Sequence, residues 1–172
     1  MVVELEERVT EIERRLAELE GPGGQEERPA VARRPDFWAL DGLKAQLGEA
    51  GTENGGVLFT GSVRLPTGER YEWQHGAVTD QVLEGGDWAD TAEALAALGK
   101  PVRLRLLREI LGGRRTAAEL AGLPDVGTTG QVYHHLRQLT AAGWLRSTGR
   151  GRFEVPAGRV VPLLVALTVA AG

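Results

Sequence analysis

The stretch LGKPVRLRLLREILGGRRTAAELAGLPDVGTTGQVYHHLRQLTAAGWLRSTGRGRFEV, residues 98–155, contains the strongest pattern in this chain. In its first part Leu104, Leu107 and Leu111 recur at helical spacing, and Arg103 falls on another face. This spacing predicts a half-buried helix that carries arginines on its exposed sides.

Two capping boxes predict the next two helices. Thr116 is followed three residues later by Glu119, which favours a short helix that ends near Ala121. Thr128 and Gln131 repeat the same spacing and predict the start of a longer helix. The two helices are separated by a loop rich in proline and glycine.

The longer helix is expected to continue to about Ala142, where Gly143 stops it. Three apolar residues form its predicted buried stripe: Val132, Leu136 and Leu139. The opposite face carries amides, an imidazole and a guanidinium: Gln131, His134, Gln138 and Arg137. Side chains of these kinds suit hydrogen bonding to base edges and phosphates.

Two short alternating segments follow, residues 144–148 and 152–155, on either side of Gly149-Arg150-Gly151. They predict a small β-hairpin, or wing, with an arginine at its tip. Three helices followed by a wing are typical of a winged helix-turn-helix, so DNA binding is the first hypothesis for this segment.

The same residues resemble the ArsR-type winged-helix repressors. The resemblance is carried by residues 98–107, by Ala118-Glu119-Leu120, by His135-Leu136-x-x-Leu139 and by Ala142-Gly143-Trp144-Leu145. Tyr133, two residues before His135, also resembles PadR-type regulators, which share the winged helix. The resemblance covers roughly the last two fifths of the chain.

Membership of this family would imply that the helix from Thr129 enters the major groove and that the wing touches the DNA backbone or minor groove. It would also imply a structural role for His135. The predicted groove contacts are Thr128, Thr129, Gln131, His134, Arg137 and Gln138. The predicted phosphate or minor-groove contacts are Arg146, Arg150 and Arg152.

The charge of the chain is divided unevenly. Residues 100–172 hold 11 Lys and Arg against 4 Asp and Glu, a balance of +7. Residues 1–99 hold the other 9 basic and 20 acidic residues, a balance of -11, which gives the net charge of -4. A basic half facing DNA beside an acidic half facing water or protein is the plain interpretation. Alternatively, the arginines only solvate helix surfaces, although this explains Arg150 between two glycines poorly.

The N-terminal residues 1–21 predict a parallel dimeric coiled coil. The a and d positions of three heptads are filled by Val2, Leu5, Val9, Ile12, Leu16 and Leu19. A helix packed on its own domain is the alternative, but an isolated helix this short would be marginal without a partner. A dimer also suits two DNA half-sites. Residues 22–35 are interpreted as a linker.

Residues 36–86 predict a short helix followed by a β-hairpin. The hairpin is expected because apolar and polar residues alternate on both sides of the turn at Pro66-Thr67-Gly68-Glu69. A lone hairpin is marginally stable, so its apolar face is expected to cover a helix, a partner subunit or a ligand. Three aromatic residues are the candidates for binding a small apolar effector: Tyr71, Trp73 and Trp88. Aromatic residues in small proteins more often belong to the core.

Residues 87–172 are assigned to the winged-helix domain. Its leading helix, 87–98, is expected to direct Trp88, Ala92, Leu95 and Leu98 inward. Its last helix would lie in a dimer interface by resemblance to ArsR-type proteins, through Leu163, Leu164 and Leu167. A core helix of the monomer is the alternative. The apolar stretch here is too short to cross a bilayer.

Several chemistries are not expected. The chain has no Cys, and its three His residues do not lie in the last helix, so metal binding and thiol sensing are not predicted. Neither a phosphate-binding loop nor a nucleophile elbow is present, so we expect no cofactor and no enzymatic activity. Without a signal peptide, cytoplasmic residence at the nucleoid is expected.

The sequence is therefore interpreted as that of a mainly α protein with small β elements. Its expected function is that of a homodimeric bacterial repressor that binds double-stranded DNA. Two alternatives stay open: a protein-interaction adaptor for another regulator or a sigma factor, and a nucleoid-associated protein without sequence preference.

Overall fold

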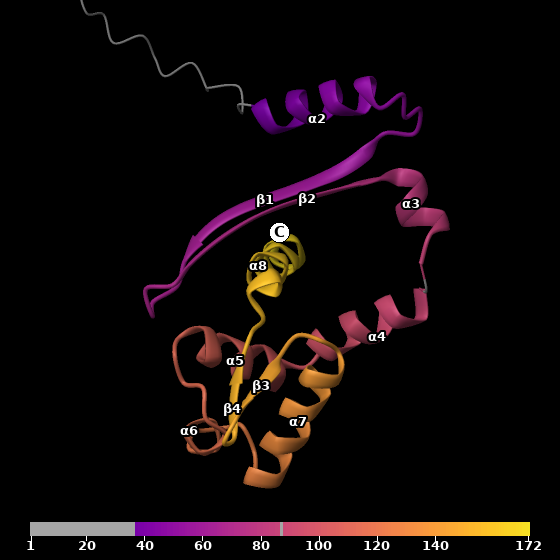
Figure 1. The fold of residues 1–172 in the computed structure, drawn as a ribbon. Coiled ribbons are helices and arrows are strands. Elements are labelled where there is room, and N and C mark those ends of the chain that lie inside the picture. The colour runs from indigo at the N-terminus through magenta and orange to yellow at the C-terminus, as the bar shows by residue number, and fades with distance from the viewer. Residues whose placement is uncertain (1–36, 87) are drawn as a thin grey trace, which may run out of the picture. The chain divides into compact units, whose positions relative to one another are not determined.

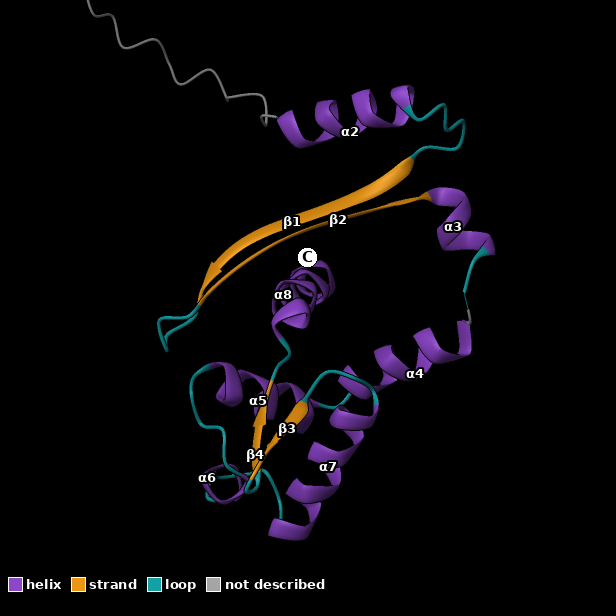
Figure 2. Ribbon diagram, viewed as in Figure 1, coloured by secondary structure: helices purple, strands orange, loops and turns teal. Residues whose placement is uncertain are grey.

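Seven helices and two antiparallel hairpins form the described part of the chain, residues 37–86 and 88–172, in this computed structural model (Figure 1; Figure 2). The fold is therefore a mixture of α and β structure, as the sequence predicts. The coiled coil predicted for residues 1–21 and the linker predicted for residues 22–35 lie outside the described residues.

The longer hairpin pairs β1, Gly56–Arg64, with β2, Arg70–Val78. Pairing is continuous from Gly56 opposite Val78 to Arg64 opposite Arg70. Its turn closes because the Gly68 N–H donates to the Leu65 carbonyl over 2.9 Å. The predicted hairpin is confirmed.

Helix α8, Ala157–Ala171, lies in the concave side of this hairpin (Figure 1). The approach is close at Gly61 of β1, where a Cβ atom would lie 2.6 Å from a methyl carbon of Val161. Trp73 of β2 also packs on Gly158, at ordinary contact distance, since a Cβ there would lie 3.4 Å from the indole ring. The apolar face of the hairpin was expected to cover a helix, a partner subunit or a ligand. In the structure it covers a helix.

The main core lies below α8, among α5, Pro101–Leu111, α6, Ala117–Ala121, and α7, Thr129–Ala141. The residues with 0% exposure include the whole predicted stripe of α7: Val132, Leu136 and Leu139. Large apolar side chains that are sealed from water in this way supply most of the folding free energy.

The predicted buried face of α5 is confirmed at Leu107 but differs at the other positions. Its buried face consists of Arg103, Leu106, Leu107 and Ile110, whereas Leu104 and Leu111 are only half-buried. Helix α5 contacts α4, α7 and β4, and its buried face includes a charged residue. A pattern of apolar residues alone could not place Arg103 inside.

The leading helix α4, Trp88–Leu98, is also turned differently from the prediction. Leu98 is buried as expected, but Trp88 and Leu95 are 60% and 58% exposed, and Ala92 is exposed as well. The contact with the core runs through the small residues of α4 instead. The indole N–H of Trp144 donates to the Ala94 carbonyl over 2.8 Å, and Ala97 is buried.

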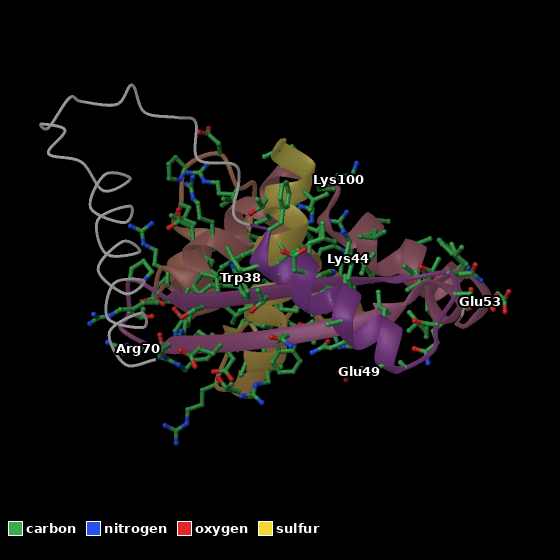
Figure 3. The ribbon with its side chains drawn as sticks, turned by 90° about the horizontal axis from the view of Figure 1, so that it is seen from above. Trp38, Lys44, Glu49, Glu53, Arg70 and Lys100 are labelled. Atoms are coloured by element: carbon green, nitrogen blue, oxygen red, sulfur yellow. The ribbon has the colours of Figure 1, made fainter. Side chains whose placement is uncertain are left out.

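Two further helices flank the longer hairpin. Helix α2, Trp38–Glu49, precedes β1, and α3, Thr79–Glu84, follows β2. Figure 3, which looks down on the hairpin, shows α2 with Lys44 crossing the strands. Neither helix has a buried residue, and Leu43 and Leu47 of α2 are half-buried.

Helix α8 contributes to the core of the single chain. Leu163 has 0% exposure, so this residue serves the core, as the alternative to a dimer interface proposes. Leu164 and Leu167 are partly buried against the same core. Within the described residues, no helix combines the length and the hydrophobicity that crossing a lipid bilayer requires.

The Gly61→Ala substitution is predicted to destabilise the fold by about 1–3 kcal/mol, because the new methyl group would overlap the buried Val161. Chemical denaturation of the variant, compared with Gly61→Ala/Val161→Ala, measures this effect. The double variant should lose less than the sum of the two single losses.

Gly76→Ala is the matched control in the same hairpin, since a Cβ there meets its nearest atoms at 3.6 Å, an ordinary contact. Equal losses for Gly61→Ala and Gly76→Ala, or strict additivity with Val161→Ala, would refute the close packing of α8 on β1.

Candidate nucleic-acid interface

The candidate interface begins at the N-terminus of α7, where the predicted capping box is confirmed. The Gln131 N–H donates to the Thr128 hydroxyl over 3.3 Å, and the Thr128 N–H donates to the Gln131 side-chain oxygen over 2.8 Å. The turn before it needs Gly127, with φ of +88°, because a Cβ there would collide with the Gln131 carboxamide. Gln131 therefore keeps only its amide nitrogen free to donate to another molecule.

The outward face of α7 carries the other predicted groove contacts. Thr129, His134 and Arg137 are exposed, and Tyr133, which the sequence analysis did not select, is 43% exposed. Among the described residues, no carboxylate pairs with Arg137. This part of α7 therefore presents hydroxyl, imidazole, phenol and guanidinium groups to solvent.

Gln138 lies near the other end of α7 and lines a cavity together with Arg103 and residues of α4. The structure thus separates Gln138 from the predicted contacts around the first turns of the helix.

The predicted wing is a short hairpin of β3, Arg146–Gly149, and β4, Arg152–Glu154. Arg150 and Gly151 form its two-residue turn with φ of +50° and +70°. Positive φ at both central residues is typical of the tight turns that match the twist of paired strands. The turn holds the exposed Arg150 at the tip, away from the core.

The wing is fastened to the start of α6 by backbone hydrogen bonds. The Phe153 N–H donates to the Arg115 carbonyl over 2.7 Å, and the Ala117 N–H donates to the Gly151 carbonyl over 2.9 Å. The Phe153 side chain is also buried in the core, with 9% of its surface exposed. Sequence reasoning missed this pairing of Arg115–Ala117 with β4, because a segment of three residues shows no alternation.

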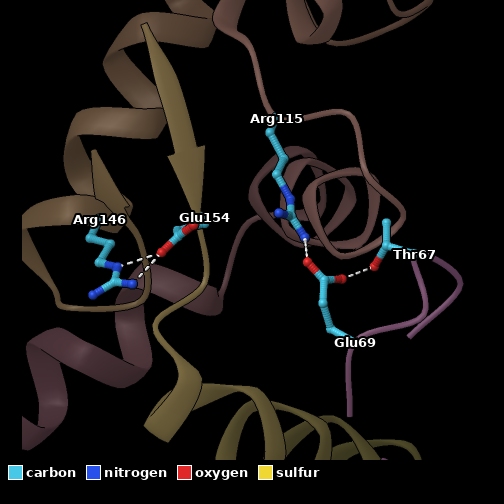
Figure 4. A network of polar contacts seen from close by, with 5 residues as sticks. All are labelled: Thr67, Glu69, Arg115, Arg146 and Glu154. Carbon is cyan, nitrogen blue, oxygen red and sulfur yellow. Dashed lines mark hydrogen bonds and ion pairs between the residues drawn. The ribbon is translucent and has the colours of Figure 1, made fainter. Parts of the chain in front are cut away.

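The three wing arginines differ in their ionic partners. Arg146 forms a salt bridge with Glu154 across the hairpin, with its Nε 2.6 Å from the carboxylate (Figure 4). Within the described residues, Arg150 and Arg152 form no such pair. The two are therefore the wing cations that are more available to an external anion.

A second ionic contact lies beside the wing and joins it to the longer hairpin. Arg115 donates to Glu69 over 2.5 Å, and the Thr67 hydroxyl donates to the other oxygen of the same carboxylate (Figure 4). The hydrogen bond from Thr67, and next the one from Arg115, lower the pKa of Glu69 below its usual value. Arg115 thus connects the β1–β2 turn with the backbone that pairs with β4.

His135 lies on the partly buried side of α7. Burial lowers its pKa first, and the nearby positive charge of Arg103 lowers it further. The imidazole is therefore neutral at neutral pH. Its Nδ1 atom is buried and has no partner in the described part of the chain.

Within the described residues, the three aromatic residues predicted for effector binding line three different cavities. Tyr71 lines one small cavity beside Arg115, Trp73 lines another on the longer hairpin, and Trp88 lines a third between α3 and α4. A group of three or more metal-ligating side chains is likewise absent from the described residues.

Comparison of the chain with protein-family models, with curated proteins and with solved structures finds no match. The functional argument therefore depends on the geometry and chemistry of this chain.

Glu69→Gln is predicted to lower the free energy of unfolding at pH 7 by about 0.5–1 kcal/mol, a small effect because the ion pair is partly exposed. Since the pKa of Glu69 is lowered in the folded state, its stabilisation is present above pH 4.5 and disappears as the pH falls through the folded-state pKa. Urea denaturation from pH 7 to pH 3 measures the difference. The variant and the wild type should converge at the acid end, and a constant difference would contradict the role of the carboxylate.

Proposed function

We propose that this protein is a sequence-specific DNA-binding transcription regulator of the winged helix-turn-helix class, acting as a repressor. Helices α5, α6 and α7 would be its three helices, α7 its recognition helix and β3–β4 its wing. The observation that carries the proposal is the exposed polar face of α7 next to a wing whose Arg150 and Arg152 form no salt bridge among the described residues.

Two properties of this surface support DNA as the ligand. The face of α7 offers donors and acceptors of the kind that read base edges in the major groove. The wing offers two guanidiniums that form no salt bridge within the described residues, and such groups suit phosphate oxygens. The carbonyls of Arg115 and Gly151 accept backbone hydrogen bonds that fasten the wing to the start of α6, so the wing would meet a duplex on a rigid support.

The contacts of the individual side chains support a separate proposed role for each in DNA binding. His134, Arg137 and the Gln131 amide nitrogen are the proposed base contacts, and Thr129 is a proposed phosphate contact. Arg150 and Arg152 are the proposed wing contacts. Arg146 is a weaker candidate because Glu154 already neutralises it, and Thr128 is engaged in the cap.

Retention of fragmented genomic DNA by the purified protein tests this proposal. Wild-type protein should enrich a few palindromic sites. Arg150→Gly should weaken binding to them about ten-fold and reduce the slope of log affinity against log salt by about 1, because one phosphate contact is lost. Glycine is chosen since the φ of +50° at this position suits it.

Two matched variants control this experiment. Arg150→Lys keeps the charge and should retain most of the affinity. Lys44→Gln removes the same charge from α2, on the far side of the hairpin from α7 (Figure 1), and should change nothing. Uniform retention of all fragments would favour a nucleoid protein. No retention would favour the protein adaptor, and either result would overturn the proposal.

We further propose that the regulator is a homodimer joined by its N-terminal heptads, which would place two recognition helices on two half-sites. Ile12→Glu puts a charge at a predicted d position and should dissociate the dimer. The mass of the particle should then fall from twice the chain mass to the chain mass of 18.5 kDa. Light scattering measures this mass. Thr10→Glu, outside the predicted a and d positions, should leave the dimer intact, and a dimer that survives Ile12→Glu would disprove the assignment.

A further inference from the structure

A cavity of about 730 Å³ lies where α4, α5, α7 and the start of α8 meet. Five polar side chains line it: Asp90 and Glu93 of α4, Arg103 of α5, Gln138 of α7 and Arg159 of α8. The remaining wall consists of alanines from α4 and α7. Small side chains leave this space open at a place where larger ones would close it.

Arg103 is the most unusual of these residues, because it is only 8% exposed and forms no ion pair within the described part of the chain. Its Nη2 atom donates a long hydrogen bond of 3.3 Å to the Ala96 carbonyl. Its Nε atom is buried without a partner. A buried guanidinium is costly unless an anion or several acceptors satisfy it. The cavity wall therefore contains a buried cation whose Nε atom has no partner among the described residues.

Arg159 provides a second cation at the same cavity. Its guanidinium carbon lies 5.0 Å from the centre of the Trp144 ring, which favours a cation–π contact. Trp144 is 5% exposed and is held by its hydrogen bond to Ala94. The indole therefore keeps the Arg159 side chain beside the cavity.

The α4 side of the cavity has the opposite charge. Asp90, Glu93, Ala94 and Ala97 recur at helical spacing, so they share one face of α4. Both carboxylates are exposed and, within the described residues, neither forms a salt bridge. The cavity thus presents two carboxylates from one helix and two guanidiniums from two other elements, with an apolar alanine wall.

We propose that this cavity binds a small zwitterion, a molecule that carries one carboxylate and one ammonium group, as an amino acid does. Arg103 and Arg159 bind its carboxylate, and Asp90 and Glu93 bind its ammonium group. The alanine wall accommodates its side chain. This site is distinct from the aromatic cluster predicted from sequence, and it does not depend on DNA binding.

Isothermal titration calorimetry of the full chain without DNA tests the proposal, with the common L-amino acids as probes. At least one amino acid should bind, whereas propionate and propylamine, which carry one charge each, should bind at least ten-fold more weakly. Asp90→Asn/Glu93→Gln should weaken amino-acid binding about ten-fold, since two charge-assisted hydrogen bonds are reduced to neutral ones. Arg103→Met should abolish binding.

The control is Asp41→Asn/Glu49→Gln, which makes the same change of charge on the exposed surface of α2 and should leave the affinity unchanged. If Arg103→Met fails to fold, the exposed pair Asp90 and Glu93 still decides the test. Absence of heat with every amino acid would overturn the proposal. So would equal affinity for propionate, or unchanged affinity in Asp90→Asn/Glu93→Gln. A failure here would leave the DNA experiment unaffected, because the two assays share no ligand.

Discussion

The packing of α8 against both the longer hairpin and the helical core is the interaction on which the rest of the described structure depends. Val161 fits against Gly61 on one side, whereas Val160 and Leu163 are buried in the core on the other. A two-stranded hairpin has too little apolar surface to be stable alone. Helix α8 supplies the missing surface, and it leads directly from β4, so the hairpin, the core and the wing are held in one unit.

That unit explains how a few polar side chains acquire defined positions. Arg115 acts twice: its carbonyl accepts a hydrogen bond from Phe153 of the wing, and its guanidinium binds Glu69 of the longer hairpin. The wing is short, and backbone hydrogen bonds at Gly151 and Phe153 hold it in place. Arg150 can therefore extend into solvent from a rigid support, which reduces the entropy that binding a phosphate would cost. The cavity at Arg103 depends on the same unit, since four helices must meet to form it.

Local sequence signals predicted much of this arrangement. The capping boxes at Thr116 and Thr128 are formed by residues three positions apart, so their geometry is set within one turn of chain. The buried stripe of α7 and the turn of the longer hairpin were likewise predicted. The orientation of α4 was not, because its contact uses Ala94 and Ala97 while Trp88 stays exposed. A prediction from periodicity places large apolar residues on the buried face. It therefore misses a contact that small residues such as alanine make.

The sequence by itself determined the location of most helices and of both hairpins, the capping boxes at Thr116 and Thr128, and which half of the chain is basic. These properties depend on neighbouring residues and on composition. Only the tertiary structure decided that Arg103 is buried, that Arg146 is paired while Arg150 is not, and that Gln138 belongs to a cavity. Each of these outcomes depends on residues from segments that are far apart in the chain or from the facing strand. The packing of whole helices and strands brings these segments together, and no local sequence pattern specifies it.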